Sequence, residues 1–206
     1  MKKNRIIIFA LIVFFVISVI SIGLNIRHSS EQDRIRRNII NQAYSALINI
    51  SNNLDELIKN IEIGETDYET NQQSLIVISH YFVRLDILLK QYSTQFPPPG
   101  IVRNSYVALF DFDFISYTLT VGAGTANDMP YCGITNDGVI SEKEVRYLVT
   151  LRDDIDVLIA AMVSSENPPN ENQNLTTSQI DNILNTFFSK WSFHNDDSPY
   201  FLLRSE

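Results

Sequence analysis

Residues 74–96, SLIVISHYFVRLDILLKQYSTQF, decide how this chain folds. The apolar residues of this stretch recur at alternating intervals of three and four: Leu75, Ile78, Phe82, Leu85, Leu89, Tyr92 and Phe96. In an α-helix this spacing places the recurring side chains on one face, and a continuous apolar face needs a partner. We therefore predict a long amphipathic helix that packs against a second helix along this seam.

The segment before this stretch predicts the partner helix. Apolar residues follow Ile35 at intervals of three or four, at Ile39, Ala43, Leu47, Ile50, Leu54, Leu57 and Ile61. Gly64 can end this helix in the left-handed conformation, and Thr66 with Glu69 forms a capping box that can begin the next one. The short link makes the two helices antiparallel neighbours.

Residues 101–122 fit two kinds of secondary structure. Phe110, Phe112 and Phe114 alternate with aspartates, which is typical of a strand. The series Tyr106, Phe110, Phe114, Tyr117 and Val121 has helical spacing. We prefer the helix, because a run of about 20 residues is long for a strand. The strand stays open as the alternative.

The glycine-rich segment 122–140 predicts the one long irregular region. Its Asn136-Asp137-Gly138 turn signal is flanked by β-prone residues at 131–134 and 139–140, so we expect a small β-hairpin. Two capping boxes follow, Ser141 with Glu144 and Thr176 with Gln179, and each precedes an amphipathic run. The predicted fold class is mainly α, an up-down helical bundle with a small β-hairpin insertion behind an N-terminal transmembrane helix.

The N-terminal prediction rests on residues 6–24, IIIFALIVFFVISVISIGL, which contain no charge. A helix of this length reaches about 28 Å, close to the hydrocarbon core of about 30 Å. We predict an uncleaved signal-anchor: a short cytoplasmic tail over 1–5, a transmembrane helix over 6–24 and an extracytoplasmic helical domain over 25–206. The protein would be single-pass in the cell membrane. The alternative is secretion after signal-peptide cleavage near Ser21-Ile22-Gly23.

Charge divides the chain unevenly. Residues 1–50 hold seven basic and two acidic residues, whereas residues 51–206 hold nine basic and 22 acidic ones. The formal net charge of −8 speaks against nucleic acid, which requires a basic face. Arg27, Arg34, Arg36 and Arg37 fit either contact with anionic lipid headgroups or an ordinary solvated helix start diluted by Glu31 and Asp33. The expected partners are thus the lipid bilayer and another protein.

Few residues suggest chemistry. The single cysteine excludes an internal disulfide and any zinc site built on two or more cysteines, and we predict no cofactor. Cys132 could serve as a nucleophile if a histidine approached it, but we prefer to interpret it as a small, half-buried thiol. Asp153, Asp154 and Asp156 are interpreted as a solvated helix face.

Residues 137–144, DGVISEKE, resemble the second half of an EF-hand calcium loop. The resemblance implies that Asp137 and Glu144 would be calcium ligands and that Gly138 would be the turn glycine. This sequence departs from the family at the first and third ligand places, which fall on Gly133 and Thr135. A turn followed by a capped helix accounts for the same residues.

The leading functional hypothesis is a non-enzymatic, membrane-anchored interaction or regulatory protein. Met129, Tyr131 and Ile134 of the irregular segment are the candidate partner contacts, because loops on a rigid scaffold often carry function. The alternative for this loop is a cover over the end of the core. Two other functions stay open: a ligand-sensing module, since the plan resembles extracytoplasmic helical sensor domains in outline, and an enzyme with a site near Cys132.

Overall fold

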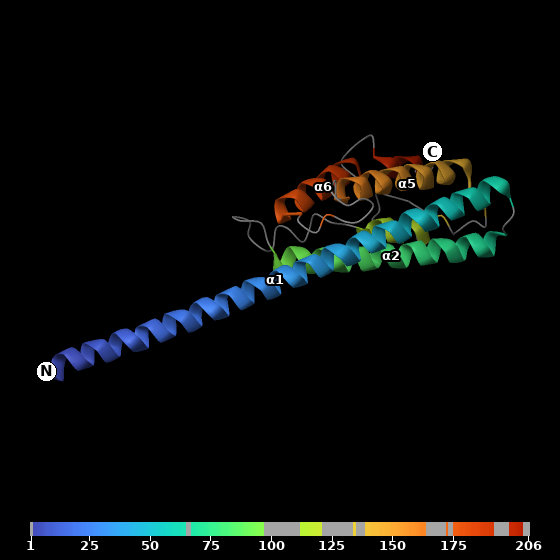
Figure 1. Ribbon diagram of the computed structural model, residues 1–206. Coiled ribbons are helices and arrows are strands. Elements are labelled where there is room, and N and C mark those ends of the chain that lie inside the picture. The colour runs from blue at the N-terminus through green and yellow to red at the C-terminus, as the bar shows by residue number, and fades with distance from the viewer. Residues whose placement is uncertain are drawn as a thin grey trace. The chain divides into compact units, whose positions relative to one another are not determined.

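The computed structural model describes residues 2–64, 67–96, 112–120, 134, 139–163, 172, 175–191 and 198–203, with side chains except those of 2–13, Thr177 and Phe201. Within these residues the chain is mainly α-helical (Figure 1). The elements are α1 (Lys2–Ile63), α2 (Tyr68–Gln95), α4 (Phe112–Thr120), α5 (Glu142–Met162), α6 (Thr177–Lys190) and the 3-10 helix η1 (Pro199–Leu203). The chain divides into two compact units, Met1–Asn38 and Ile39–Glu206.

The Met1–Asn38 unit consists of the first part of α1. Its described polar contacts are local: Arg34 pairs with Glu31 at 2.7 Å, and Arg36 pairs with Asp33 at 3.4 Å. Two of the arginines assigned to lipid headgroups therefore have acidic partners on the same helix. α1 is continuous through the end of this unit, since no proline or glycine interrupts it between Gly23 and Gly64.

One prediction about this unit is overturned. Among the helices that the structure describes, none is both long enough and apolar enough to cross a membrane. This finding contradicts the transmembrane helix over 6–24, the signal-anchor and the single-pass localisation.

The core of the Ile39–Glu206 unit contains the apolar faces that were predicted for the helices over 35–61 and 74–96. Phe82 is fully buried, as are Leu47, Ile50 and Leu85, each at 1 % exposure or less. Four helices converge on one small cavity, which is lined by Ala43 and Leu47 of α1, Leu85 and Leu89 of α2, Leu158 and Met162 of α5, and Ile180, Ile183 and Leu184 of α6. Figure 1 shows α5 and α6 on one side of the pair formed by α1 and α2.

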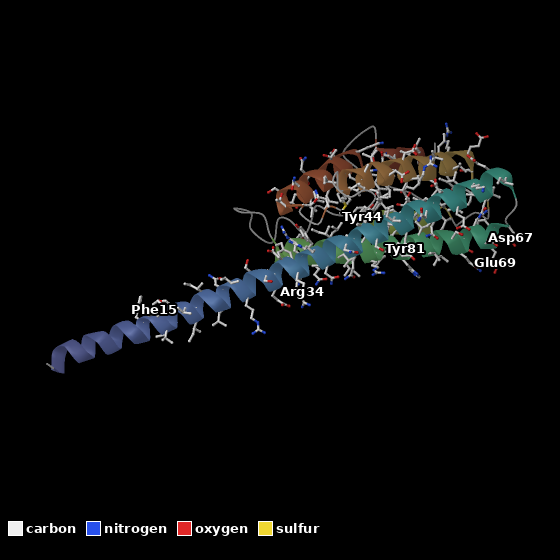
Figure 2. All side chains as sticks on the ribbon, in the orientation of Figure 1. Phe15, Arg34, Tyr44, Asp67, Glu69 and Tyr81 are labelled. Atoms are coloured by element: carbon white, nitrogen blue, oxygen red, sulfur yellow. The ribbon has the colours of Figure 1, made fainter. Side chains whose placement is uncertain are left out.

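The ends of the helices are set by a glycine and by capping side chains close to them in the sequence. Gly64 takes a φ of 70° and donates its N–H to Asn60 O at 3.1 Å, which confirms it as the end of α1. The start of α2 differs from the prediction: Asp67, not Thr66, is the N-cap, and Figure 2 shows it at this end of the helix. Its side chain accepts a hydrogen bond from Thr70 N at 2.9 Å. Its charge also suits the positive end of the helix dipole. Both later capping boxes are confirmed, at Ser141 with Glu144 and at Thr176 with Gln179.

Residues 101–122, whose sequence fits both a helix and a strand, are helical where the structure describes them. Residues Phe112–Thr120 form α4, which confirms the helix in this part, and the rest of 101–122 lies outside the described residues. α4 packs on α2 through a stacked Phe82–Phe112 pair, with ring centroids 5.9 Å apart, and a buried hydrogen bond of 2.6 Å between Ser79 and Ser116. Burial against α2 explains why the helix prevails over the strand pattern.

The predicted β-hairpin is not found in the described part of the chain, which contains no strand. Ile134, Val139 and Ile140 are described and are not in a strand, whereas residues 131–133 and 135–138 lie outside the described residues. Ile134 is instead fully buried, and its N–H donates to Thr118 O at 3.3 Å at the end of α4. The described end of the segment is thus held by core packing rather than by strand pairing.

Candidate functional site: a groove between helices α5 and α6

A groove of about 350 Å³ lies between α5 and α6. α5 contributes Asp154, Val157, Leu158 and Ala161, and α6 contributes Asn182, Ile183, Thr186, Phe187 and Lys190. Each set follows helical spacing, so each forms one stripe along its helix. The volume falls within the range of protein clefts that bind ligands, about 300–1,000 Å³.

The two helices run antiparallel past this groove. Asp154 of α5 meets Lys190 of α6, while further along α5, Met162 shares its cavity wall with Ile180. Numbers therefore rise along one helix as they fall along the other. The groove exists because Ala161 is small and exposed, and so leaves the space between the helices unfilled.

The floor of the groove is apolar. Leu158 is 2 % exposed and Phe187 is 6 % exposed, and both belong to the core of the unit. Val157 forms part of the wall and is 67 % exposed. A single exposed aliphatic residue is ordinary on a protein surface. Here, however, Val157 and the exposed Ala161 adjoin the buried floor residues in a concave surface, where a docked side chain would remove Val157 and Ala161 from water.

A rigid polar junction closes one end of the groove. Asp154 accepts a hydrogen bond from Lys190 Nζ at 2.7 Å and another from Trp191 Nε1 at 2.9 Å. Its side chain is 15 % exposed, while that of Lys190 is 50 % exposed. The Trp191 ring stacks on Phe187 and meets the ring of Tyr200 edge-on, at centroid distances of 5.8 and 5.3 Å. This end of the groove is therefore fixed by packing and by charge-assisted hydrogen bonds.

The other acidic residues near the groove connect α5 to α1. Arg152 bonds Asp55 and Asp153, each at 2.8 Å, and these hydrogen bonds raise the pKa of its guanidinium. Asp156 accepts from Ser51 Oγ at 2.6 Å. The sequence suggested that Asp153, Asp154 and Asp156 form one solvated face. Instead each carboxylate has its own partner, and Asp154 lies mostly inside.

The described residues offer little for metal or small-ligand chemistry. No group of three histidine, cysteine or acidic side chains that could hold a metal ion occurs among them. The cavity at the centre of the four helices has a volume of about 10 Å³ and is lined by apolar residues alone. That volume is at the lower limit for a single water molecule. This central cavity therefore has no room for a small ligand.

The structure separates the predicted site residues rather than bringing them together. Met129, Tyr131, Cys132 and Asp137 lie outside the described residues, so the predictions about them stay predictions. Ile134 is in the core. Glu144 accepts a hydrogen bond from Ser141 N at 2.6 Å, within the capping box. The capped-helix interpretation of Glu144 therefore agrees with the geometry found.

The groove was missed at the level of sequence, although a signal for it exists. Residues 157–163, VLIAAMV, contain no polar side chain, so the apolar surface of α5 is wider there than its seam requires. Such widening predicts a second contact surface beside the core contact. The α6 side gives no comparable signal, because Asn182 and Thr186 are common on any exposed helix face.

A comparison with protein-family models, with curated proteins and with solved structures finds no match for this chain.

Proposed function

We propose that this protein is a non-enzymatic interaction or regulatory protein, which binds a segment of another protein in the groove between α5 and α6. The observation that carries the proposal is the groove itself, a concave apolar surface with an exposed valine in its wall and polar groups at its rim. Sites that accept protein segments combine such an apolar floor with a polar rim.

The shape of the groove favours a helical or extended segment. Its walls are two antiparallel helices, and grooves of this kind accept an amphipathic helix that lays its apolar face between them. From Asp154 to Ala161 the α5 wall rises about 10 Å, which matches roughly two turns of a docked helix.

The charges at the groove favour binding over catalysis. Asp154 has two donors, Lys190 and Trp191, so this carboxylate is engaged before any ligand arrives. A general acid or base acts by exchanging a proton with the substrate, and it must be within hydrogen-bond reach of that proton. An engaged carboxylate instead stabilises the wall, while burial of the exposed apolar wall around Val157 and Ala161 would provide binding energy.

The test compares two neighbouring alanines. Ala160 and Ala161 are both exposed on α5, but only Ala161 lines the groove. Ala161→Phe fills the groove, and Ala160→Phe adds the same side chain outside it. We expect proteins captured by the wild-type chain to be lost with Ala161→Phe and retained with Ala160→Phe, while both variants melt close to the wild type.

A second variant controls for an indirect effect of the phenylalanine ring that Ala161→Phe introduces. Val157→Ser removes the exposed apolar wall without adding volume, and it should weaken the same capture. Capture that survives both Ala161→Phe and Val157→Ser would overturn the groove as the interaction site. The ligand-sensing alternative and the enzyme alternative near Cys132 both stay predictions, and the central cavity of about 10 Å³ gives the first of them no support.

A further inference from the structure

We infer that the segment bound in the groove is a basic amphipathic helix, with apolar residues on one face and lysine or arginine beside them. The inference rests on the proposed function and adds the chemical class of the partner. It depends on the charges around the groove, which are independent of the apolar surface that identified the site.

The carboxylates beside the groove outnumber the cations. Asp154 lines the α5 wall and Asp153 lies next to it, whereas Asp156 faces α1 through Ser51. Arg152 joins Asp153 to Asp55 of α1, and the cations bonded to these carboxylates are Arg152 and Lys190. Asp55, Asp153 and Asp154 thus share two cations, which leaves a local charge of −1. The side chain of Asp153 is 60 % exposed, which places part of this charge at the rim.

The opposite rim carries no cation that would repel a basic partner. In the two turns of α6 that face the groove, Asn182 and Thr186 are uncharged and exposed. Lys190 stands only at the closed end, where it is bonded to Asp154. A docked lysine or arginine beside the α5 rim would therefore meet acidic groups without a neighbouring positive side chain.

The net charge of the whole Ile39–Glu206 unit also favours a basic partner. The Ile39–Glu206 unit has nine basic and 22 acidic residues, a net charge of −13. A field of this sign raises the encounter rate of positively charged partners and lowers that of acidic ones. Specificity for a basic segment then comes from Asp153 at the rim, while affinity comes from the exposed apolar wall around Val157.

The experiment uses the full chain and three synthetic peptides. The first peptide has leucines at helical i, i+3, i+4 and i+7 spacing and lysines on the remaining positions. The second carries glutamate in place of each lysine, and the third has the composition of the first in scrambled order. Trp191, the single tryptophan, lies at the end of the groove and reports binding by fluorescence, with titration calorimetry as an independent measurement.

We expect the lysine peptide to bind at least about tenfold more tightly than the glutamate or scrambled peptide. Its affinity should fall as salt rises from about 0.01 M to about 1 M, which shortens the screening length about tenfold. Asp153→Asn should weaken it roughly two- to fivefold, in line with a partly exposed ion pair. Glu62→Gln, which removes the same charge from an exposed position outside the groove, is the matched control.

The groove and the charge of its partner are tested separately. If the lysine and glutamate peptides bind equally and Ala161→Phe blocks both, the groove stands and the basic partner is overturned. If neither binds, or if Ala161→Phe has no effect on binding, the inference is overturned as well. The capture of cellular proteins by the wild type and by Ala161→Phe is measured separately, and its result tests only the proposed function.

A second copy of the chain is the main competing occupant. The Met1–Asn38 unit holds seven basic and two acidic residues, so it also has the sign that the groove favours. Sedimentation of the full chain distinguishes the two cases. Concentration-dependent self-association that Ala161→Phe abolishes would assign the groove to another copy, and the inference of a separate partner would then be wrong.

Discussion

Trp191 Nε1 donates a hydrogen bond of 2.9 Å to Asp154 Oδ2, and this bond fixes the end of α6 against the middle of α5. Both side chains also belong to larger groups. Asp154 pairs with Lys190, and Trp191 packs on Phe187 and Tyr200. The bond therefore joins the closed end of the groove to an aromatic cluster that includes the C-terminal 3-10 helix η1.

The first prediction concerns this bond. Asp154→Ala leaves a buried indole N–H without an acceptor and should lower the free energy of unfolding by about 1–3 kcal/mol. Asp154→Asn keeps an acceptor and loses mainly the ion pair with the half-exposed Lys190, so its loss should be about 1 kcal/mol or less. Urea unfolding followed by Trp191 fluorescence measures both. Equal losses in the two variants would show that charge, not the indole bond, is what matters.

The second prediction concerns the seam of α2. Phe82 is fully buried and stacks on Phe112, so Phe82→Ala should destabilise the protein by about 3–5 kcal/mol. Ile87 lies on the same helix but is 60 % exposed. Ile87→Ala should therefore change stability by no more than about 0.5 kcal/mol. A Phe82→Ala protein that melts like the wild type would mean that the seam does not form the core.

The third prediction separates the capping box from a calcium site at Glu144. Ser141→Ala removes the side-chain half of the box and should lower the free energy of unfolding by about 1 kcal/mol. Glu144→Gln keeps the backbone contact with Ser141 N, since glutamine also completes a capping box, and should be nearly neutral. Melting temperatures should be the same in calcium and in chelator. A calcium-dependent rise that Glu144→Gln abolishes would support the EF-hand resemblance instead.

The fourth prediction concerns alkaline pH. Burial by itself lowers the pKa of Lys90, but its hydrogen bonds and charge interactions with Asp86 and Asp113 outweigh burial, and the net shift is upward from 10.5. A raised pKa in the folded state gives stability that is complete below the unfolded pKa and is lost as the pH rises through the folded one. Stability should therefore fall above about pH 10.5. Burial raises the pKa of Tyr147 as well, which acts in the same direction.

A Lys90→Met variant isolates the lysine contribution. Urea midpoints measured from neutral to strongly alkaline pH should fall less steeply for Lys90→Met than for the wild type, because the variant has no ammonium to lose. The Tyr147 contribution remains in both proteins. Identical slopes would remove Lys90 from the explanation of the alkaline loss.

Local interactions made several features predictable from the sequence alone. Gly64 ends α1, and the capping boxes at Ser141 and Thr176 begin α5 and α6, because each depends on residues within four positions along the chain. The seam through Phe82 was predictable for a similar reason, since helical periodicity states which face is buried. The start of α2 differed by one residue, because Asp67 and Thr66 offer competing caps.

Only the tertiary structure decided what those faces meet. The sequence shows that Asp154, Asp156 and Trp191 exist, but not that Asp154 bonds Trp191 or that Asp156 bonds Ser51, which is 105 positions away. Many pairings of amphipathic helices satisfy the same periodicity, and the choice among them depends on how whole surfaces fit. The groove beside Ala161 has the same origin: a small side chain becomes a binding surface only when a second helix stands opposite it.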